Sequence, residues 1–208
     1  MQQILTEYKA EEFLEEEGFP VVERMLFVDK DKAFEYAKSI GFPVVLKIAS
    51  DKILHKTELN AIKLNVDENN FFKSFDELRK IKIEKNGIVV QKFLNGKNII
   101  IGLKKDPVFG HIIVAGIGGI FAEIIKNVSF RVTPINKHEA LEMLKELKGY
   151  NILSGYRGEK VDIKNIIKVI LKVSKLAIDH PEITELDLNP LIVNPKYVKV
   201  VDARIVFN

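Results

Sequence analysis

Hydrophobic and polar residues follow two periods along the chain, and these periods predict helices and strands in mixed order. Hydrophobic residues at helical spacing predict helices over 7–17, 71–81, 137–147 and 162–179, and a further helix from Asp29 or Asp31 to Gly41. Alternating or continuous hydrophobic runs predict strands near 24–28, in "FPVVLKIA", "NAIKLNV", "GIVVQKFL", "KNIIIGLKK" and "HIIVAGI", around a turn in "FAEIIKNVSFRVTPI", and in a hairpin at the end of the sequence. Hairpins occur beside strand–helix–strand units, so the predicted fold class is α+β, or mixed α/β. The hairpin-rich part begins near residues 90–95, which predicts two lobes, 1–90 and 91–208.

Composition narrows the classes of protein to consider. The chain has no cysteine, which excludes disulfides, thiolate catalysis and cysteine-bound zinc. The net charge of +3 comes from lysines scattered among glutamates, so we expect no nucleic-acid partner. The acidic first residues and the glycine-broken run "IIVAGIGGIFA" predict neither a signal peptide nor a membrane segment. We therefore expect a cytoplasmic protein with no membrane partner.

The last two strands form a hairpin whose register can be counted from its loop. If "NPKY" is the loop, Val193 faces Val198, and an antiparallel ladder then sets Asn189 opposite Asp202 and Asp187 opposite Arg204. Alternation predicts one polar face, made of Glu185, Asp187, Asn189, Asp202 and Arg204. It predicts a core face made of Leu186, Leu188, Ile192, Val201, Ala203, Ile205 and Phe207.

The polar face of this hairpin has two interpretations. Directly opposed residues have Cβ atoms roughly 4.5–5.5 Å apart, so the oxygens of Asn189 and Asp202 can share one small cation. Such ligands suit Mg²⁺, which takes its remaining ligands from water and phosphate. Alternatively, Asp187 and Arg204 form a partly exposed ion pair, and Asn189 with Pro190 simply ends the strand. The hairpin alone does not decide between them.

Three other positions suggest phosphate chemistry. Lys47 stands in the middle of a buried strand, where a lysine either reaches an edge or holds an anion. The polar segment that follows contains Ser50, His55 and Lys56, and His55 is either a surface residue or a nucleophile for a phosphoryl group. Arginine occurs only at positions 24, 79, 131, 157 and 204. Arg131, in the apolar segment "FRV", has either a phosphate partner or a structural salt bridge.

Taken together, several segments resemble the ATP-grasp β subunit of ADP-forming acyl-CoA synthetases of the acetate–CoA ligase type, which are related to succinyl-CoA synthetase. They occur in the family's order along essentially the whole chain: "GFPVVLKIAS", "ILHKTE", "IIIGLKKDPVFG", "GIGGIFAEIIKNVSFRV", "LKGY", "GYRGE" and "ELDLNPLIVNP…VDARI". The sequence departs from the family at Asn60 and Ala61, where two glycines are common, and at Lys92 and Asn98, where acidic residues are common.

The resemblance implies an ATP-grasp fold, with two α+β lobes that hold a nucleotide between them. It implies that ADP or ATP is the substrate and Mg²⁺ the cofactor, with Asn189 and Asp202 as metal ligands and Asp187 as a further or outer ligand. His55 would carry a phosphoryl group. The nucleotide and its phosphates would be bound by Lys47, Ser50, Lys56, the hinge residues Gln91, Lys92, Phe93 and Leu94, and Asn98 and Arg131.

The resemblance also implies a reaction and a partner. Acyl-CoA, ADP and phosphate would give the free acid, CoA and ATP. A CoA-binding α subunit with a second phosphorylatable histidine would complete an α₂β₂-type assembly. Two alternatives stay open: a non-catalytic regulatory ATP-grasp module, which the changes at the hinge suggest, and a carboxylate–amine ligase of the same fold.

Overall fold

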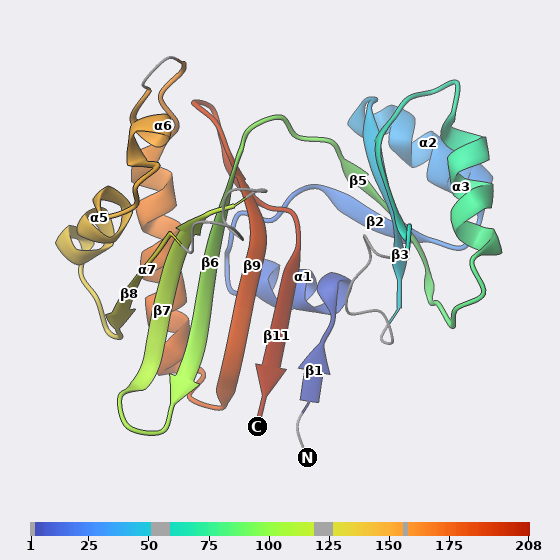
Figure 1. The fold of residues 1–208 in the computed structure, drawn as a ribbon. Helices are drawn as coiled ribbons and strands as arrows, with labels where there is room; N and C mark the ends of the chain where they lie inside the picture. The colour runs from blue at the N-terminus through green and yellow to red at the C-terminus, as the bar shows by residue number, and fades with distance from the viewer. Residues whose placement is uncertain (1–2, 51–58, 119–126, 156–157) are drawn as a thin grey trace. The chain divides into compact units, whose positions relative to one another are not determined.

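The chain folds into two compact units, each with its own sheet and core (Figure 1). The computed structural model describes residues 3–50, 59–118, 127–155 and 158–208. Unit 1 comprises Met1–Val21 and Asn95–Asn208, and unit 2 comprises Val22–Leu94. Both units combine helices with antiparallel strands, as the mixed periodicity predicts.

Unit 2 is a four-stranded antiparallel sheet with two helices on one face, within the described residues. The sheet order is β2-β5-β3-β4. Hydrophobic residues of α2 and α3 pack against Val44, Leu46 and Ile48 of β3, which alternate along the strand and face the helices. Asp29 caps α2, because its Oδ1 accepts hydrogen bonds from the backbone N–H groups of Asp31 and Lys32. The elements are β2 (Arg24–Phe27), α2 (Lys30–Ile40), β3 (Val44–Ala49), β4 (Ile62–Val66), α3 (Phe71–Lys80) and β5 (Gly87–Lys92).

Unit 1 is built on a larger antiparallel sheet with seven strands in the described residues. Its order is β1-β11-β9-β6-β7-β8, with β10 paired to β9. The strands are β1 (Gln3–Leu5), β6 (Lys97–Asp106), β7 (Gly110–Ile117), β8 (Val128–Val132), β9 (Ile183–Val193), β10 (Val198–Val200) and β11 (Ala203–Phe207). The helices are α1 (Glu7–Glu16), α5 (Lys137–Lys145), α6 (Tyr150–Ser154) and α7 (Ile163–Asp179).

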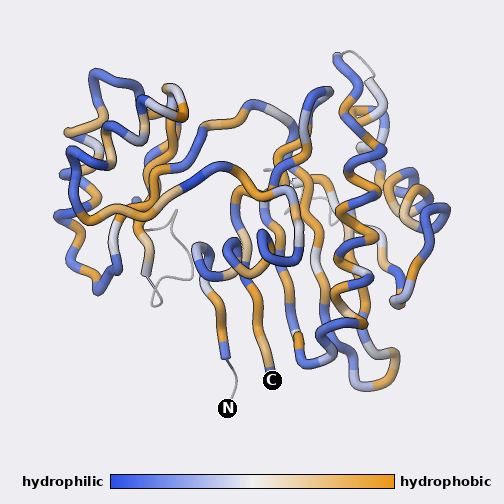
Figure 2. Tube along the Cα trace, turned by 180° about the vertical axis from the view of Figure 1, so that it is seen from behind, coloured by the Kyte–Doolittle hydropathy of each residue, from blue (hydrophilic) through white to orange (hydrophobic). Residues whose placement is uncertain are grey.

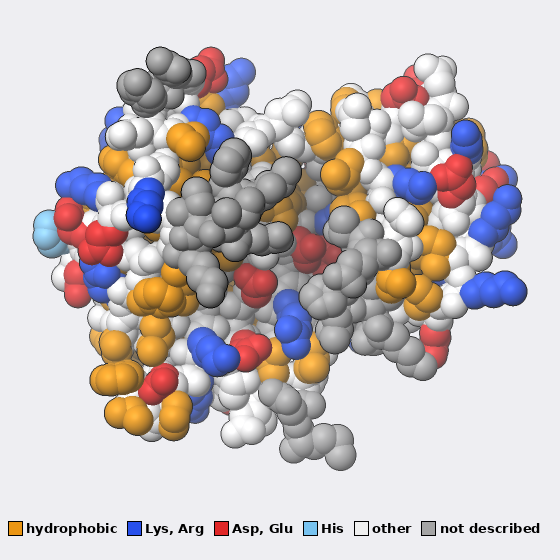
Figure 3. Space-filling view, in the orientation of Figure 1, with side chains coloured by type: hydrophobic (Ala, Val, Ile, Leu, Met, Phe, Trp, Pro, Cys, Tyr) orange, Lys and Arg blue, Asp and Glu red, His pale blue; other side chains and the backbone are white. Residues whose placement is uncertain are grey.

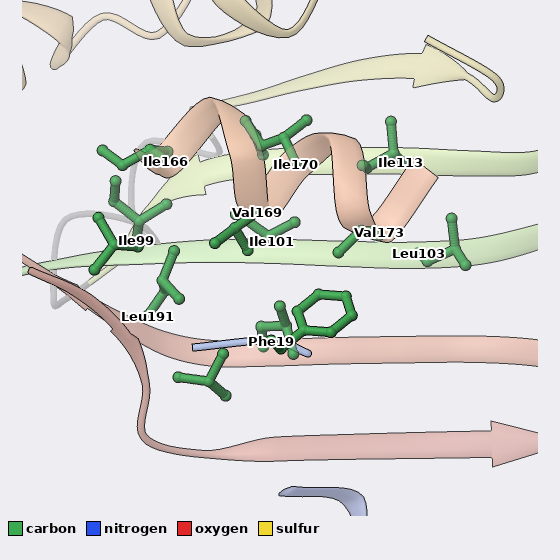
Figure 4. Packing of buried hydrophobic residues seen from close by; sticks show 14 of the residues in the cluster. Phe19, Ile99, Ile101, Leu103, Ile113, Ile166, Val169, Ile170, Val173 and Leu191 are labelled. Atoms are coloured by element: carbon green, nitrogen blue, oxygen red, sulfur yellow. The ribbon is translucent and has the colours of Figure 1, made fainter. Parts of the chain in front are cut away.

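Helices α1 and α7 cover one face of the large sheet and enclose the core of unit 1 (Figure 1). Seen from behind, α7 carries both hydrophobic and hydrophilic residues, while the strands beneath it are mainly hydrophobic (Figure 2). Side chains of α7 and β6 meet in one cluster (Figure 4). Because one face of the sheet is buried in this way, polar side chains of the same strands are left on the opposite face.

The N-terminal segment belongs to unit 1, which differs from the predicted boundary between residues 90 and 91. Strand β1 pairs with β11, with Ile4 opposite Val206. Leu14 of α1 is fully buried in the core of unit 1, and Val21 forms a bridge with Val200. A three-residue strand is too short to show a period, and its partner lies at the other end of the sequence. The sequence pattern therefore gives no sign of this pairing.

Candidate functional site

The terminal hairpin has the predicted register. Val198 pairs with Val193, and Arg204 pairs with Asp187. Between these pairs, the backbone N–H of Asn189 donates to the carbonyl oxygen of Asp202 at 3.1 Å. The prediction that positions 189 and 202 stand opposite each other is thus confirmed.

The predicted core face of the hairpin changes beyond Pro190. Leu191, Val193 and Val200 belong to the core cluster of unit 1, while Ile192 and Val201, which were predicted for the core face, are buried outside this cluster. Strand β6 pairs Ile101 with Leu188 and Ile99 with Leu191, so two residues of β9 stand opposite one residue of β6. This bulge shifts the alternation by one position, which simple counting along the strand does not reveal.

Asp187, Asn189 and Asp202 form a cluster, which we call the acidic cluster, on the face of the sheet opposite α7. Asp187 keeps an exposed surface, but neighbouring atoms withdraw its carboxyl partly from water and so raise its pKa, and the negative charge of Asp202 raises it further. A hydrogen bond with the side chain of Asn189 and the positive charge of Arg204 oppose these effects without cancelling them. The two carboxylates therefore repel each other, which is the arrangement that a bound cation relieves.

The donor set of the acidic cluster fits Mg²⁺. It offers two carboxylates and one amide oxygen, and Mg²⁺ is usually bound by one or two carboxylates together with water and substrate phosphates. In the described part of the chain, no group of three or more His, Cys, Asp or Glu side chains is placed to hold a metal ion. Figure 3 shows acidic and basic side chains side by side over β9 and β11.

Unit 2 places a buried lysine on the face of its sheet that α2 and α3 leave uncovered. Lys47 is only 3 % exposed, and it alternates with the residues of β3 that face the helices. It stands opposite Val89 of β5. Gln91 lies on the same face two residues further along β5 and is also buried. Its Oε1 has no hydrogen-bond partner among the described residues, so this face retains an acceptor suited to a ligand.

Arg24, for which the sequence indicated no role, also lies on this face. Arg24 is directly opposite Gln91 in the β2–β5 ladder. Its guanidinium Nη1 donates to the carbonyl oxygen of Val22 at 3.4 Å. The face thus combines a lysine, an arginine and an amide, a set suited to an anionic ligand. In the sequence, the rarity of arginine was the one feature that could have drawn attention to Arg24.

Comparison with known proteins places the chain in a family. Residues 1–207 match the family described as "ATP-grasp domain". The chain belongs to the ATP-grasp family. It is 39% identical to the β subunit of ADP-forming acetate–CoA ligase I from Pyrococcus furiosus, over 97% of the chain and 91% of that protein. It is 43% identical to ADP-forming acetate–CoA ligase I from Archaeoglobus fulgidus, over 95% of the chain but only 33% of that longer protein.

Solved structures give the same assignment. Acetyl-coenzyme A synthetase 1 from Candidatus Korarchaeum cryptofilum, in complex with coenzyme A, Ca-AMPCP and HgCl⁺, has a TM-score of 0.93 and 39% identity. The match covers 99% of this chain and 94% of that one. Among the described helices of this ATP-grasp chain, none has the length and apolar content needed to cross a bilayer.

The predicted hinge of the ATP-grasp chain borders the division between its units, since unit 2 ends at Leu94. Gln91 and Lys92 are the last two residues of β5. The exposed Lys92 lies 3.9 Å from a carboxylate oxygen of Glu23, and the backbone N–H of Phe93 donates to Pro43. Phe93 and Leu94 are half-buried. An adenine contact for these residues stays a prediction.

Two predicted phosphate-binding residues make structural contacts. The Ser50 hydroxyl donates to the carbonyl oxygen of Glu84 at 2.6 Å, which uses its one hydrogen. Arg131 forms an ion pair with Glu146 that joins β8 to α5, and this contact raises the pKa of its guanidinium. Ser129 donates to the same carboxylate. Arg131 therefore forms the structural salt bridge that the sequence left open as its alternative role. We do not propose Ser50 or Arg131 as phosphate ligands.

The remaining predicted residues lie elsewhere. Asn98 has an exposed side chain near the start of β6, and its carbonyl oxygen accepts from the N–H of Gly118 at 2.8 Å. His55 and Lys56 lie outside the described residues. Two groups of predicted residues are therefore brought together: Asp187, Asn189 and Asp202 in unit 1, and Lys47 and Gln91 in unit 2.

Proposed function

We propose that this ATP-grasp chain is the nucleotide-binding, phosphoryl-transfer β subunit of an ADP-forming acyl-CoA synthetase. The overall reaction is acyl-CoA + ADP + phosphate = acid + CoA + ATP. The sequence matches β subunits of ADP-forming acetate–CoA ligases over nearly their whole length. This similarity favours a catalytic subunit over a regulatory module or a carboxylate–amine ligase.

The observation that carries the proposal is the acidic cluster on the terminal hairpin. Asp187, Asn189 and Asp202 would hold Mg²⁺, which supplies positive charge to the phosphates of ADP or ATP when bound. In unit 2, Lys47 would bind a phosphate through its buried ammonium group, and Gln91 would offer its side-chain carbonyl to the base. Unit 1 by itself offers oxygen ligands for the metal, and unit 2 by itself offers a buried lysine and a buried amide for the nucleotide.

The phosphoryl group would reach ADP through His55, as the resemblance implies. In this step the P–N bond to the imidazole breaks, and a P–O bond forms to the terminal phosphate oxygen of ADP. Because the other ring nitrogen carries a proton during the transfer, His55 leaves as a neutral imidazole, ready for the next phosphoryl group. A structure of the Korarchaeum enzyme, 39% identical to this chain, contains Mg-AMPPCP and a phosphohistidine segment that points towards the nucleotide-binding site.

The reaction requires a partner that binds CoA and carries the second histidine. Two matched relatives are named as β subunits, and the Archaeoglobus relative is about three times as long as the matched region. We therefore propose a CoA-binding α subunit and an α₂β₂-type assembly.

Phosphorylation of the chain tests this function. We expect acid-labile label on the chain when it is incubated with its CoA-binding subunit, Mg²⁺ and ATP labelled at the γ-phosphate. His55→Ala is expected to abolish the label, whereas His138→Ala, which changes an exposed histidine of α5, is expected to retain it. Absence of label from the wild-type chain beside an active partner would contradict the proposal.

A further inference from the structure

The edge strand β8 presents hydrophobic side chains to solvent. Val128, Phe130 and Val132 alternate along the strand and are 41%, 53% and 48% exposed. On the same face, Phe130 stands opposite Val114 of β7, and Val132 stands opposite Ile112. Both β7 residues are only half-buried. This end of the sheet therefore carries an apolar surface on the face that α7 does not cover.

The turn between β6 and β7 extends this surface. Val108 and Phe109 are 79% and 63% exposed. The turn is held in shape by Asp106, whose Oδ1 accepts from the backbone N–H groups of Val108 at 2.8 Å and Phe109 at 2.9 Å. Gly110 closes the turn with a φ of +76°, a conformation that favours glycine. Figure 3 shows hydrophobic side chains over β7, β8 and this turn, in the lower left of the view.

Within the described residues, β8 is a five-residue strand at the edge of the sheet, and its outward face carries no lysine, proline or bulge. Natural edge strands carry outward lysines, prolines or bulges that prevent pairing and aggregation. The outward positions of β8 are valine, phenylalanine and valine, and its one charged residue, Arg131, is engaged by Glu146. A hydrophobic surface that is kept exposed in this way marks a site of interaction.

The apolar surface lies on the same face of the sheet as the acidic cluster. Asp187 stands opposite Gly102 of β6, Gly102 opposite Val114 of β7, and Val114 opposite Phe130 of β8. Three steps between neighbouring strands separate Asp187 from Phe130, which is about 14 Å. A protein bound to the apolar surface would therefore lie next to the proposed metal site.

We propose that the apolar surface, made of Val108, Phe109, Val128, Phe130 and Val132, is the docking surface for the CoA-binding subunit. The inference rests on the proposed function, because the phosphoryl relay through His55 requires the CoA-binding subunit to dock on this chain. The relatives point to the same occupant. The matched region occurs as a separate β subunit or as about a third of a longer chain. In both forms the matched region works beside another folded region. An apolar, aromatic surface fits that neighbour, because the core of a protein interface is typically apolar and aromatic.

Substitutions on the apolar surface test this assignment by affinity for the partner. We expect Phe130→Asp to weaken binding of the full chain to its CoA-binding subunit at least tenfold, because the charge would be buried in the interface. Phe109→Asp is expected to act in the same direction. Ile178→Asp is the matched control: Ile178 is 58% exposed on α7, which covers the opposite face, and affinity is expected to change less than twofold. Analytical ultracentrifugation of mixtures gives the affinities, and thermal unfolding verifies that each variant is folded.

The outcomes separate this inference from the proposed function. Calorimetry of Mg·ADP with the chain alone is expected to give the same affinity for wild type and Phe130→Asp. If both surface variants bound the partner with wild-type affinity, while Mg·ADP binding and histidine labelling stayed intact, the docking proposal would be wrong and the proposed function would stand. If Phe130→Asp instead abolished self-association of the chain and left partner binding unchanged, the docking proposal would be wrong. The apolar surface would then bind a second copy of the chain. A wild-type chain that takes no label and binds no Mg·ADP would overturn the proposed function itself.

Discussion

At the scale of single residues, the charge of Asp187 separates the two interpretations of the hairpin. A simple cross-strand ion pair with Arg204 would lower the pKa of the Asp187 carboxyl. The structure gives the opposite result, because withdrawal from water and the charge of Asp202 outweigh the arginine. The negative charge of Asp202 beside Asp187 is therefore not offset by Arg204, and a bound cation would relieve the repulsion between the two carboxylates.

Removing one carboxylate of the acidic cluster tests this interpretation. Asp202→Asn preserves the shape of the side chain and removes one negative charge. We expect the affinity for ADP in the presence of Mg²⁺ to fall by roughly tenfold or more, as when a group around a metal is lost. Glu185→Gln is the matched control, because it removes a charge from the same face two residues from Asp187. Calorimetric titrations with and without Mg²⁺ give the comparison, and equal losses in both variants would point to general charge instead of a metal site.

At the scale of elements, the terminal hairpin shows what the sequence can and cannot predict. The loop length and the alternation fixed its register, so the meeting of Asn189 and Asp202 was predictable. The bulge opposite Ile100 was not, because it arises between β9 and β6, and the pattern of one strand contains no information about its partner. The contact of Arg131 with Glu146 was likewise unpredictable in its detail, since it depends on the packing of α5 against β8.

The end of α7 carries a histidine that links it to two other elements. Nε2 of His180 lies 3.3 Å from a carboxylate oxygen of Glu17, just after α1, and Nδ1 lies 3.1 Å from Glu182, just before β9. The ring also packs edge-to-face on Phe13 at 5.2 Å. Partial burial lowers the pKa of His180, but the hydrogen bonds to Glu182 and Glu17 outweigh it, and the net shift is upward from 6.5.

This upward shift predicts a pH-dependent contribution to stability. A group whose pKa is higher in the folded protein than in the unfolded chain stabilises the folded protein. For His180 this stabilisation is complete at pH values below 6.5, the pKa in the unfolded chain, and it is lost as the pH rises through the higher pKa of the folded protein. His180→Gln is therefore expected to cost up to about 1 kcal/mol of unfolding free energy near pH 5.5 and clearly less near pH 8.5. Denaturant titrations at both pH values measure the difference, with His138→Gln as the control for loss of an imidazole. A cost that grows with pH would contradict the assignment.

At the scale of the whole molecule, the order of residues along the chain does not follow the division into units. Residues up to Val21 precede unit 2 in the sequence, yet they complete the sheet and core of unit 1. Fold class was predictable because the longer described helices and most strands show their own period, although the five-residue helix α6 does not. The division was not, because it depends on the pairing of β1 with β11, which lie at opposite ends of the sequence.

Two matched core substitutions test this division. Leu14 of α1 and Leu78 of α3 are both fully buried, one in the core of unit 1 and the other in that of unit 2. Replacing a buried leucine by alanine costs about 2–5 kcal/mol, and even the lower value is enough to raise opening of the affected core roughly 30-fold. We expect Leu14→Ala to speed hydrogen exchange of the backbone amides in β6, β9 and β11, and to leave those of β3 and β5 unchanged. Leu78→Ala is expected to show the reverse pattern. If Leu14→Ala instead accelerated exchange in β3 and β5, residues 1–90 would behave as one lobe, and the N-terminal segment would not belong to the large sheet.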